Sequence, residues 1–250
     1  AVFLSVVVPF AVLQPIREIW VLLVAGALIF TVGIIDDIRS LKPSTKLVAQ
    51  VVVASGLVFF GFRLQWVESL TVDALLTLVW IVGITNALNL IDNMDGLCAG
   101  IGLIAVVALL LGVGPLTGVT PTVLYLALLA GATGGFLVYN VHPASVFLGD
   151  SGSLFIGLTL AAGSLEFSQY AVGSNLLAVI AAPVLVLLIP IFDTALVTTS
   201  RLLAGRPASQ GGLDHSSHRL VAIGLPERTA VGVLWILATL GAAFGWSLGR

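Results

Sequence analysis

The chain has 250 residues, of which 59% are hydrophobic and 9% charged, with a mean hydropathy of +1.16 and a formal net charge of −2. An average soluble domain carries about 25% charged residues, so the composition excludes an ordinary soluble protein and indicates one embedded in lipid. Nothing in it suggests a nucleic-acid partner. The single cysteine, Cys98, excludes an internal disulfide and a cysteine-based zinc site.

Apolar runs long enough to cross a bilayer recur along the whole chain. They lack the alternation typical of barrel strands, so we predict an all-α, polytopic bundle of transmembrane helices forming a single membrane domain over residues 1–250. The first residue is Ala1, inside an apolar run, and we expect N-terminal helices of the full protein to be missing. The predicted helices, about nine spans, cover residues 2–14, 19–35, 46–61, 70–86, 97–113, 121–139, 151–166, 174–200 and 228–248.

Charged residues divide unequally between the two predicted faces. The loops near 36–45, 87–96, 140–150 and 201–227 share one face, and those near 15–18, 62–69, 114–120 and 167–173 share the other. The first face carries Arg39, Lys42, Lys46, Arg201, Arg206, Arg219 and Arg228, whereas the second has Arg17 and Arg63. By the positive-inside rule the first face is cytoplasmic. Six aspartates lie on that same face: Asp36, Asp37, Asp92, Asp95, Asp150 and Asp214.

The first motif is Gly33-Ile-Ile-Asp-Asp-Ile-Arg39, which places Asp36 and Asp37 at the end of an apolar helix. Adjacent carboxylates repel unless a cation lies nearby. Mg²⁺, which prefers oxygen ligands, is one candidate for that cation, and Arg39 with Lys46 is another. The alternative is an ordinary solvated helix end.

The second motif is a polar stripe, because Asn86, Asn89, Asp92 and Asn93 recur at helical spacing before Asp95 and Gly96. Their amide and carboxylate oxygens can line a cavity at headgroup depth and coordinate a metal or a sugar. The alternative is simple helix termination, with a turn at Asp95 and a cap for the next helix.

The third motif, Phe147-Leu-Gly-Asp-Ser-Gly-Ser153, comes directly before an apolar helix. Backbone amides at a helix N-terminus form a phosphate site. Asp150 would repel that phosphate unless a divalent ion bridges the two, which favours Mg²⁺. The alternative is a plain N-cap.

The fourth motif is the long basic loop from Arg201 to Leu220, which concentrates arginines and two histidines. Such a loop suits a clamp on a diphosphate. Two alternatives stay open: a zinc site formed by Asp214, His215 and His218, or a positive loop that serves topology alone. We interpret His142 as an ordinary loop residue.

In order, the four motifs resemble the polyprenyl-phosphate N-acetylhexosamine-1-phosphate transferases of the MraY/WecA type, over about 190 residues. The resemblance implies transfer of a hexosamine 1-phosphate from a UDP-sugar to a membrane polyprenyl phosphate, with release of UMP. It implies Mg²⁺, with Mn²⁺ as a substitute, and a site on the cytoplasmic face of a bacterial inner membrane. A homodimer is compatible with it.

The resemblance also assigns roles to particular residues. Asp36 and Asp37 match the family's catalytic aspartate pair, and Asn89 and Asp150 match its Mg²⁺ ligands. The substrate-binding positions that it implies are Lys46, Asn86, Asp92, Asp95, His215, His218 and Arg219. The form Asp-His-Ser-Ser-His-Arg lacks the three consecutive histidines of the MurNAc-pentapeptide branch, and so favours the GlcNAc branch that starts O-antigen, teichoic acid or arabinogalactan synthesis.

Two alternatives to a GlcNAc-1-phosphate transferase stay open. One is a phospho-MurNAc-pentapeptide transferase of the same family. The other is a transporter, because Asp193 lies within an apolar run beside Pro190, where a charge is costly and normally faces a protein interior or a wet cavity. Transport predicts polar residues that reach both faces, whereas here they gather on one.

Overall fold

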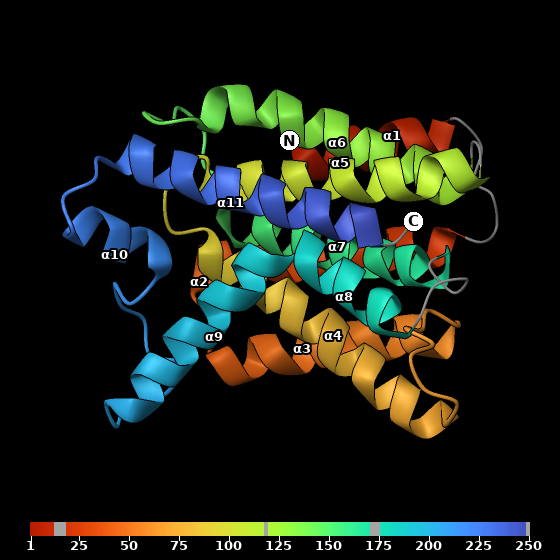
Figure 1. Cartoon of the computed structure of the whole chain (residues 1–250). Coiled ribbons are helices and arrows are strands. Elements are labelled where there is room, and N and C mark those ends of the chain that lie inside the picture. The colour runs from red at the N-terminus through yellow and green to blue at the C-terminus, as the bar shows by residue number, and fades with distance from the viewer. Residues whose placement is uncertain (13–18, 118–119, 171–175, 249–250) are drawn as a thin grey trace.

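The computed structural model describes residues 1–12, 19–117, 120–170 and 176–248, and within these ranges the regular structure is helical. Figure 1 shows the helices packed into one bundle. In chain order they are α1 (Val2–Val12), α2 (Trp20–Arg39), α3 (Pro43–Phe59), α4 (Leu70–Ile91), α5 (Leu97–Thr117), α6 (Pro121–Asn140), α7 (Gly149–Tyr170), α8 (Leu176–Val186), α9 (Leu188–Leu203), α10 (Ser216–Ala222) and α11 (Glu227–Leu248).

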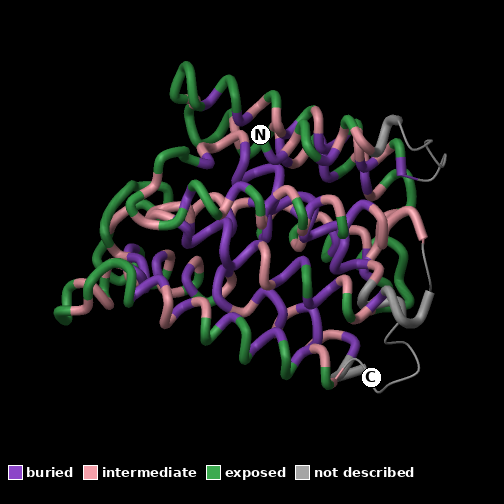
Figure 2. Tube along the Cα trace, turned by 90° about the horizontal axis from the view of Figure 1, so that it is seen from above, coloured by how far each residue is buried: buried purple, intermediate pink, exposed green. Residues whose placement is uncertain are grey.

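The bundle is that of a multi-pass membrane protein. Four of its described helices, α2, α4, α6 and α11, are long and apolar enough to cross a membrane, and α8 with α9 would add a fifth as one bent span. Large apolar side chains cover the outside, as at Leu28, Val79 and Leu240, which are 52%, 66% and 61% exposed. Figure 2 shows the buried residues running through the inner part and the exposed ones along the outer helices. This outer surface suits contact with lipid tails.

Helix α7 forms the centre of the bundle. Every residue from Gly152 to Leu165 is buried, and the helix packs against α2, α4 and α5. A helix that is apolar on all sides is stable only when other helices surround it. The sequence places the motif with Asp150 at the first turn of this helix, so the most enclosed element of the fold also carries a predicted site residue.

Two glycines let α2 and α4 lie directly against the backbone of α7. A Cβ atom on Gly33 would lie 2.3 Å from Cα of Ser151, and one on Gly157 would lie 2.8 Å from Cα of Thr85. Small residues at such crossings allow membrane helices to approach closely. The close approach fixes the ends of α2 and α4 beside the start of α7.

The apolar run predicted as helical over 174–200 is helical in its described part, but it forms two helices. Its described part is α8 and α9, which are bent by 78° at Leu187. Pro190 has no N–H to donate to the carbonyl of Val186, and its ring crowds that carbonyl, so the helix breaks one turn before it.

The predicted loop over 201–227 is also wrong in part, because it contains the short helix α10. Seven residues are too few to show clear periodicity, and the first of them is held by a contact from another helix, which is described below. The predicted loop at 15–18, with Arg17 and Glu18, lies outside the described residues. So do parts of the predicted loops at 114–120 and 167–173.

The contact between α2 and α7 yields a test. We expect Gly33→Ala to lower the free energy of unfolding by about 1–3 kcal/mol, because its methyl group meets backbone that cannot move aside. Thermal unfolding in detergent would measure the change. Gly56→Ala is the matched control, since open space surrounds Gly56 within α3, and it should leave stability unchanged or slightly higher. Equal melting of both variants would contradict the proposed packing constraint.

Candidate functional site

Four helix termini meet at one end of the bundle, the left end in Figure 1, where α10 also lies. They are the C-terminal ends of α2 and α4 and the N-terminal ends of α3 and α7. The contacts below join loops that the sequence assigned to one face, so the predicted grouping of the loops around 36–45, 87–96, 140–150 and 201–227 is confirmed.

The ammonium group of Lys46, on α3, is the hub of this end. Its Nζ lies 2.8 Å from Oδ2 of Asp36, 2.6 Å from Oδ2 of Asp150 and 2.9 Å from Oδ1 of Asn89. These oxygens come from α2, α7 and α4. Asn89 also donates to Oδ1 of Asp150 at 2.7 Å and to Oγ of Ser153 at 2.9 Å. Lys46 therefore joins residues from three of the predicted motifs into one polar cluster.

Asp37 caps the N-terminus of α7. Its Oδ1 accepts from the backbone N–H of Asp150 at 2.8 Å, and its Oδ2 accepts from that of Ser151 at 3.2 Å. The predicted phosphate site on these amides is therefore wrong, because a carboxylate from α2 already takes the place of the anion. Gly149 permits the contact, since it has a φ of +68° and a Cβ there would lie 2.9 Å from Asp37.

Asp36 faces the other way from Asp37. It is buried, and its Oδ1 accepts from the backbone N–H of Leu41 at 2.6 Å while its Oδ2 meets Lys46. The adjacent carboxylates are thus separated by different partners, one bound to an ammonium and one to helix amides. This confirms the need for positive partners that the sequence indicated.

The polar stripe on α4 divides among three neighbours. Asn86 forms a reciprocal amide pair with Gln50 of α3, Asn89 belongs to the Lys46 cluster, and Asn93 accepts from the hydroxyl of Ser217 in α10 at 2.7 Å. Sequence reasoning missed Gln50 and Ser217. Gln50 lies one helical turn after Lys46, a spacing that places both on one face of α3 and could have identified it.

Asp92 points into the same region without a partner. Among the described residues, no hydrogen bond or ion pair to its carboxylate is present. Burial, with the charges of Asp150 and Asp37, raises the pKa of Asp92 to about 7. A carboxyl in this state is poised to gain from a cation that would relieve the repulsion.

Asp95 is turned away from this cluster toward the loop after α6. Its Oδ2 lies 3.0 Å from Nδ1 of His142 and accepts from the backbone N–H of Ala144 at 3.0 Å. His142 also lies 3.6 Å from a carboxylate oxygen of Glu227. The interpretation of His142 as an ordinary loop residue is therefore incomplete, because it links two acidic side chains.

The basic loop is held by its own ion pairs. Asp214 accepts from Nε of the buried Arg201 at 3.1 Å and from Arg206 at 2.7 Å, and these two arginines lower its pKa. Arg219 donates to Oγ of Ser200 at 2.7 Å and to the carbonyl of Asp214 at 3.0 Å. Since Asp214 is committed to arginines, the zinc alternative with His215 and His218 has no support in the described part of the chain.

The two histidines of this loop lie together at the start of α10. Their ring centroids are 5.8 Å apart. Burial, with the nearby His215, lowers the pKa of His218, which is therefore mostly neutral at pH 7. His218 also lines a polar cavity of about 440 Å³ with Asn93, Asp95 and Glu227. Asp95 and His218, two predicted substrate-binding residues, thus line one cavity.

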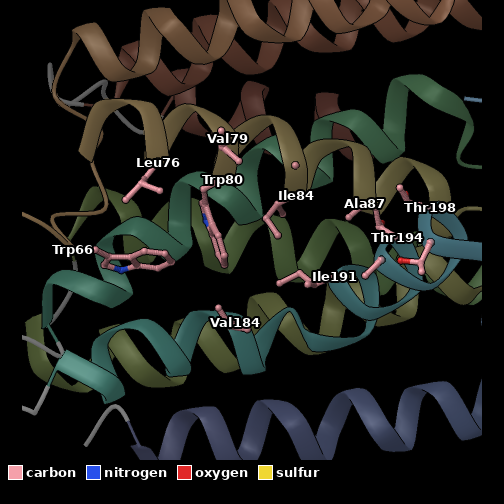
Figure 3. A pocket seen from close by; sticks show the side chains of 13 residues that line it. Trp66, Leu76, Val79, Trp80, Ile84, Ala87, Val184, Ile191, Thr194 and Thr198 are labelled. Atoms are coloured by element: carbon pink, nitrogen blue, oxygen red, sulfur yellow. The ribbon is translucent and has the colours of Figure 1, made fainter. Parts of the chain in front are cut away.

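An apolar groove of about 470 Å³ runs between α4 and the bent α8–α9 pair. Figure 3 shows that Trp66, Trp80 and Ile84 line one side and that Ile191 and Thr194 face them from α9. From Leu76 to Ala87 the groove follows α4 toward Asn89, a length of roughly 16 Å at 1.5 Å per residue. It therefore runs along α4 toward the end of the bundle that carries the polar cluster.

The charge balance at the polar end suits a divalent cation. Asp36 and Asp150 contact the ammonium of Lys46, and the charges of Asp37 and Asp150 act on the nearby Asp92, so four carboxylates share this end with that ammonium. In the described residues no three His, Cys, Asp or Glu side chains form a ready metal site. The donors of Asn89 and Asp150 are nevertheless amide and carboxylate oxygens, which Mg²⁺ prefers. The residues present fit this ion by chemistry and by charge.

Known proteins that are similar to this chain are named as transferases. Residues 19–168 match the family model Glycosyl transferase family 4. A probable undecaprenyl-phosphate N-acetylglucosaminyl 1-phosphate transferase of Bacillus subtilis is 38% identical over 86% of this chain and 61% of its own length. A decaprenyl-phosphate N-acetylglucosaminephosphotransferase of Mycobacterium tuberculosis is 39% identical over 88% and 62%. A phospho-N-acetylmuramoyl-pentapeptide-transferase of Shouchella clausii is 33% identical over 76% and 54%. The chain spans about three fifths of the first two relatives.

The raised pKa of Asp92 predicts a pH-dependent stability. An unfolded aspartate has a pKa of about 3.9, so between pH about 4 and about 7 the folded state binds more protons at Asp92 than the unfolded state does. Stability therefore falls as pH rises through this range, and Asp92→Asn should remove that part of the fall. Thermal unfolding in detergent should show similar melting of both proteins near pH 4 and higher melting of the variant near pH 8. Parallel curves would contradict this.

Proposed function

The chain belongs to glycosyl transferase family 4, and we propose that it transfers GlcNAc 1-phosphate from UDP-GlcNAc to a membrane polyprenyl phosphate, releasing UMP. The observation that carries the proposal is the cluster in which Lys46 is shared by oxygens of Asp36, Asn89 and Asp150 at one end of a membrane bundle. Family membership argues against the transport alternative.

Catalysis of phosphoryl transfer depends on positioning the reactants and neutralising their charge more than on covalent catalysis by the protein. Lys46 supplies one fixed positive charge, and Arg219 of the basic loop supplies another near the departing UMP, where the rings of His215 and His218 supply hydrogen-bonding groups. Asn89 and Asp150 would hold Mg²⁺, which when bound neutralises negative charge on the diphosphate. This assignment is supported by their oxygen donors and by the excess of carboxylates around them.

The lipid phosphate is the attacking group in this proposal. A phosphate monoester has a second pKa of about 6 and is largely ionised at neutral pH, so a strong base is not required. Asp36 and Asp37 assist by orienting the reactants rather than by forming a phosphorylated intermediate. Their contacts support this, because Asp36 holds Lys46 and Asp37 holds the amides of α7.

The apolar groove beside α4 suits the isoprenoid tail of the acceptor. Its walls of Trp66, Trp80 and Val79 offer apolar contact along the membrane direction, and it extends along α4 as far as Ala87, two residues before Asn89. A tail in this groove would present its phosphate to the polar cluster. The cavity with Asp95 and His218 would then take the nucleotide side.

Several further assignments belong to the same proposal. Asp92 and Asp95 bind the nucleotide side, and Asn86 supports Lys46 through its pair with Gln50. The basic end faces the cytoplasm of a bacterium, by the positive-inside rule. Residues 1–250 form one transferase domain with about nine spans. The homodimer stays a prediction.

The direct test measures UMP release by the full protein in detergent with undecaprenyl phosphate and Mg²⁺. We expect release with UDP-GlcNAc and little with UDP-MurNAc-pentapeptide. Asp150→Asn should lower the rate by at least about 100-fold, because it removes a carboxylate from the centre of charge neutralisation. Release with the pentapeptide donor alone would favour the MurNAc branch. No release from either donor would overturn the transferase proposal.

Lys46 offers a second test with an internal control. Lys46→Met should lower the rate by about 100-fold or more, since Asp36 and Asp150 lose the cation they share. The same change at the exposed Lys42, at the N-cap of α3, should leave the rate within about threefold. A similar loss in both variants would show that Lys46 acts only through general surface charge.

A further inference from the structure

A buried aspartate outside the polar cluster holds the histidine loop in place. Asp193 lies on α9 and is 1% exposed. Its Oδ2 lies 2.7 Å from Nδ1 of His215, and its Oδ1 accepts from the backbone N–H of Ser216 at 2.6 Å and from the Ser216 hydroxyl at 2.7 Å. The carboxylate thus binds the residue before α10 and the first residue of α10.

These contacts determine which nitrogen of His215 carries a proton. A carboxylate can only accept hydrogen bonds, so the Nδ1 atom beside it must be the donor. In the neutral ring, Nε2 then keeps its lone pair. Among the described residues, no hydrogen bond to Nε2 of His215 is present. The carboxylate of Asp193 therefore leaves this one ring nitrogen available.

The same helix end is joined to the polar cluster. Ser217 donates to Asn93 at the end of α4 at 2.7 Å, and the ring of His218 lies beside that of His215. Asp193 fixes α10 from one side and Asn93 fixes it from the other. A histidine ring set in this way has both its place and its tautomer decided before substrate arrives.

We propose that Asp193 is a positioning residue, which holds His215 through its Nδ1–H so that Nε2 faces the diphosphate of the donor, where it can take up a proton from water and then donate a hydrogen bond to a phosphate oxygen. This inference rests on the proposed function for its consequence in catalysis. The interpretation of Asp193 as part of an ion pathway is replaced by one in which its burial serves the histidine loop. Its neighbour Thr194 lines the apolar groove, so one turn of α9 contacts both the groove and the histidine loop.

Replacement by asparagine distinguishes positioning from simple packing. Asn keeps the shape of Asp193 but has one oxygen and one NH₂ group. The two donors of Ser216 favour the oxygen on their side, which turns the NH₂ group toward His215. Nδ1 must then accept, and the proton moves to Nε2. Asp193→Asn should therefore invert the tautomer while leaving the fold intact.

The test is ¹⁵N NMR of the full protein, labelled at histidine, in detergent without substrate at pH about 8.5, above the ordinary imidazole pKa of about 6.5. The chain has three histidines, so single replacements of His142, His215 and His218 assign the signals. We expect a proton on Nδ1 of His215 in the wild type and its loss in Asp193→Asn. A wild-type ring protonated on Nε2 alone, or a spectrum unchanged by the substitution, would overturn the proposal.

Two further variants serve as controls for the spectrum. Asp73→Asn changes another buried aspartate, which accepts from the backbone of Trp66 at 3.0 Å at the opposite end of α4, and it should leave the His215 signals unchanged. Ser216→Ala removes one donor to Asp193 and should keep the proton on Nδ1. Its loss in Ser216→Ala would mean that the cap, and not the carboxylate, fixes the ring, which would also overturn the proposal.

Kinetics supply the second readout. Asp193→Asn should lower kcat for UMP release by about 10- to 100-fold while KM for UDP-GlcNAc stays within about threefold. Asp73→Asn should retain the wild-type kcat. Equal rates in Asp193→Asn and wild type would overturn the catalytic consequence. If the wild type released no UMP, the proposed function would fail, whereas the NMR result would still decide whether Asp193 sets the tautomer.

Discussion

The sharing of one ammonium group among three helices is the interaction on which the site depends. Lys46 contacts oxygens from α2, α4 and α7 within 2.9 Å. Carboxylates at the partly buried end of a membrane bundle are costly unless a positive charge compensates them. One lysine compensates part of this cost and leaves an excess of negative charge, which is the physical basis for expecting a divalent cation there.

The central helix α7 holds α2 and α4 in this arrangement through close backbone contacts. Gly33 and Gly157 allow α2 and α4 to touch it directly, and Asp37 then reaches across to cap its first turn. Packing and electrostatics reinforce each other at this point, because the cap is available only when the helices are close. The pair Asp36 and Asp37, which the sequence predicts to be catalytic, therefore also has a structural role.

The bent α8–α9 pair joins the two halves of the proposed reaction. Its break at Leu187 directs α9 along one wall of the apolar groove, and its last turns reach the basic loop. Thr194 and Asp193 are neighbours in the chain, yet one lines the groove while the other binds His215. In the proposed reaction, such a helix would bring a lipid tail and a polar donor to one end of the membrane bundle.

The sequence by itself determined the helical membrane class, most helix positions and the grouping of the conspicuous polar motifs at one end, because hydrophobic run length and charge asymmetry are local properties. Only the tertiary structure decided partners. Asp37 lies far from α7 in sequence and His142 gave no strong local signal, so their contacts with Asp150 and Asp95 could not be derived. The spacing of Gln50 from Lys46 placed it on the same face of α3 but did not specify its pair with Asn86. The bend at Leu187 follows from the local effect of Pro190, whereas the anchoring of α10 by Asp193 depends on packing between distant segments, which no local pattern encodes.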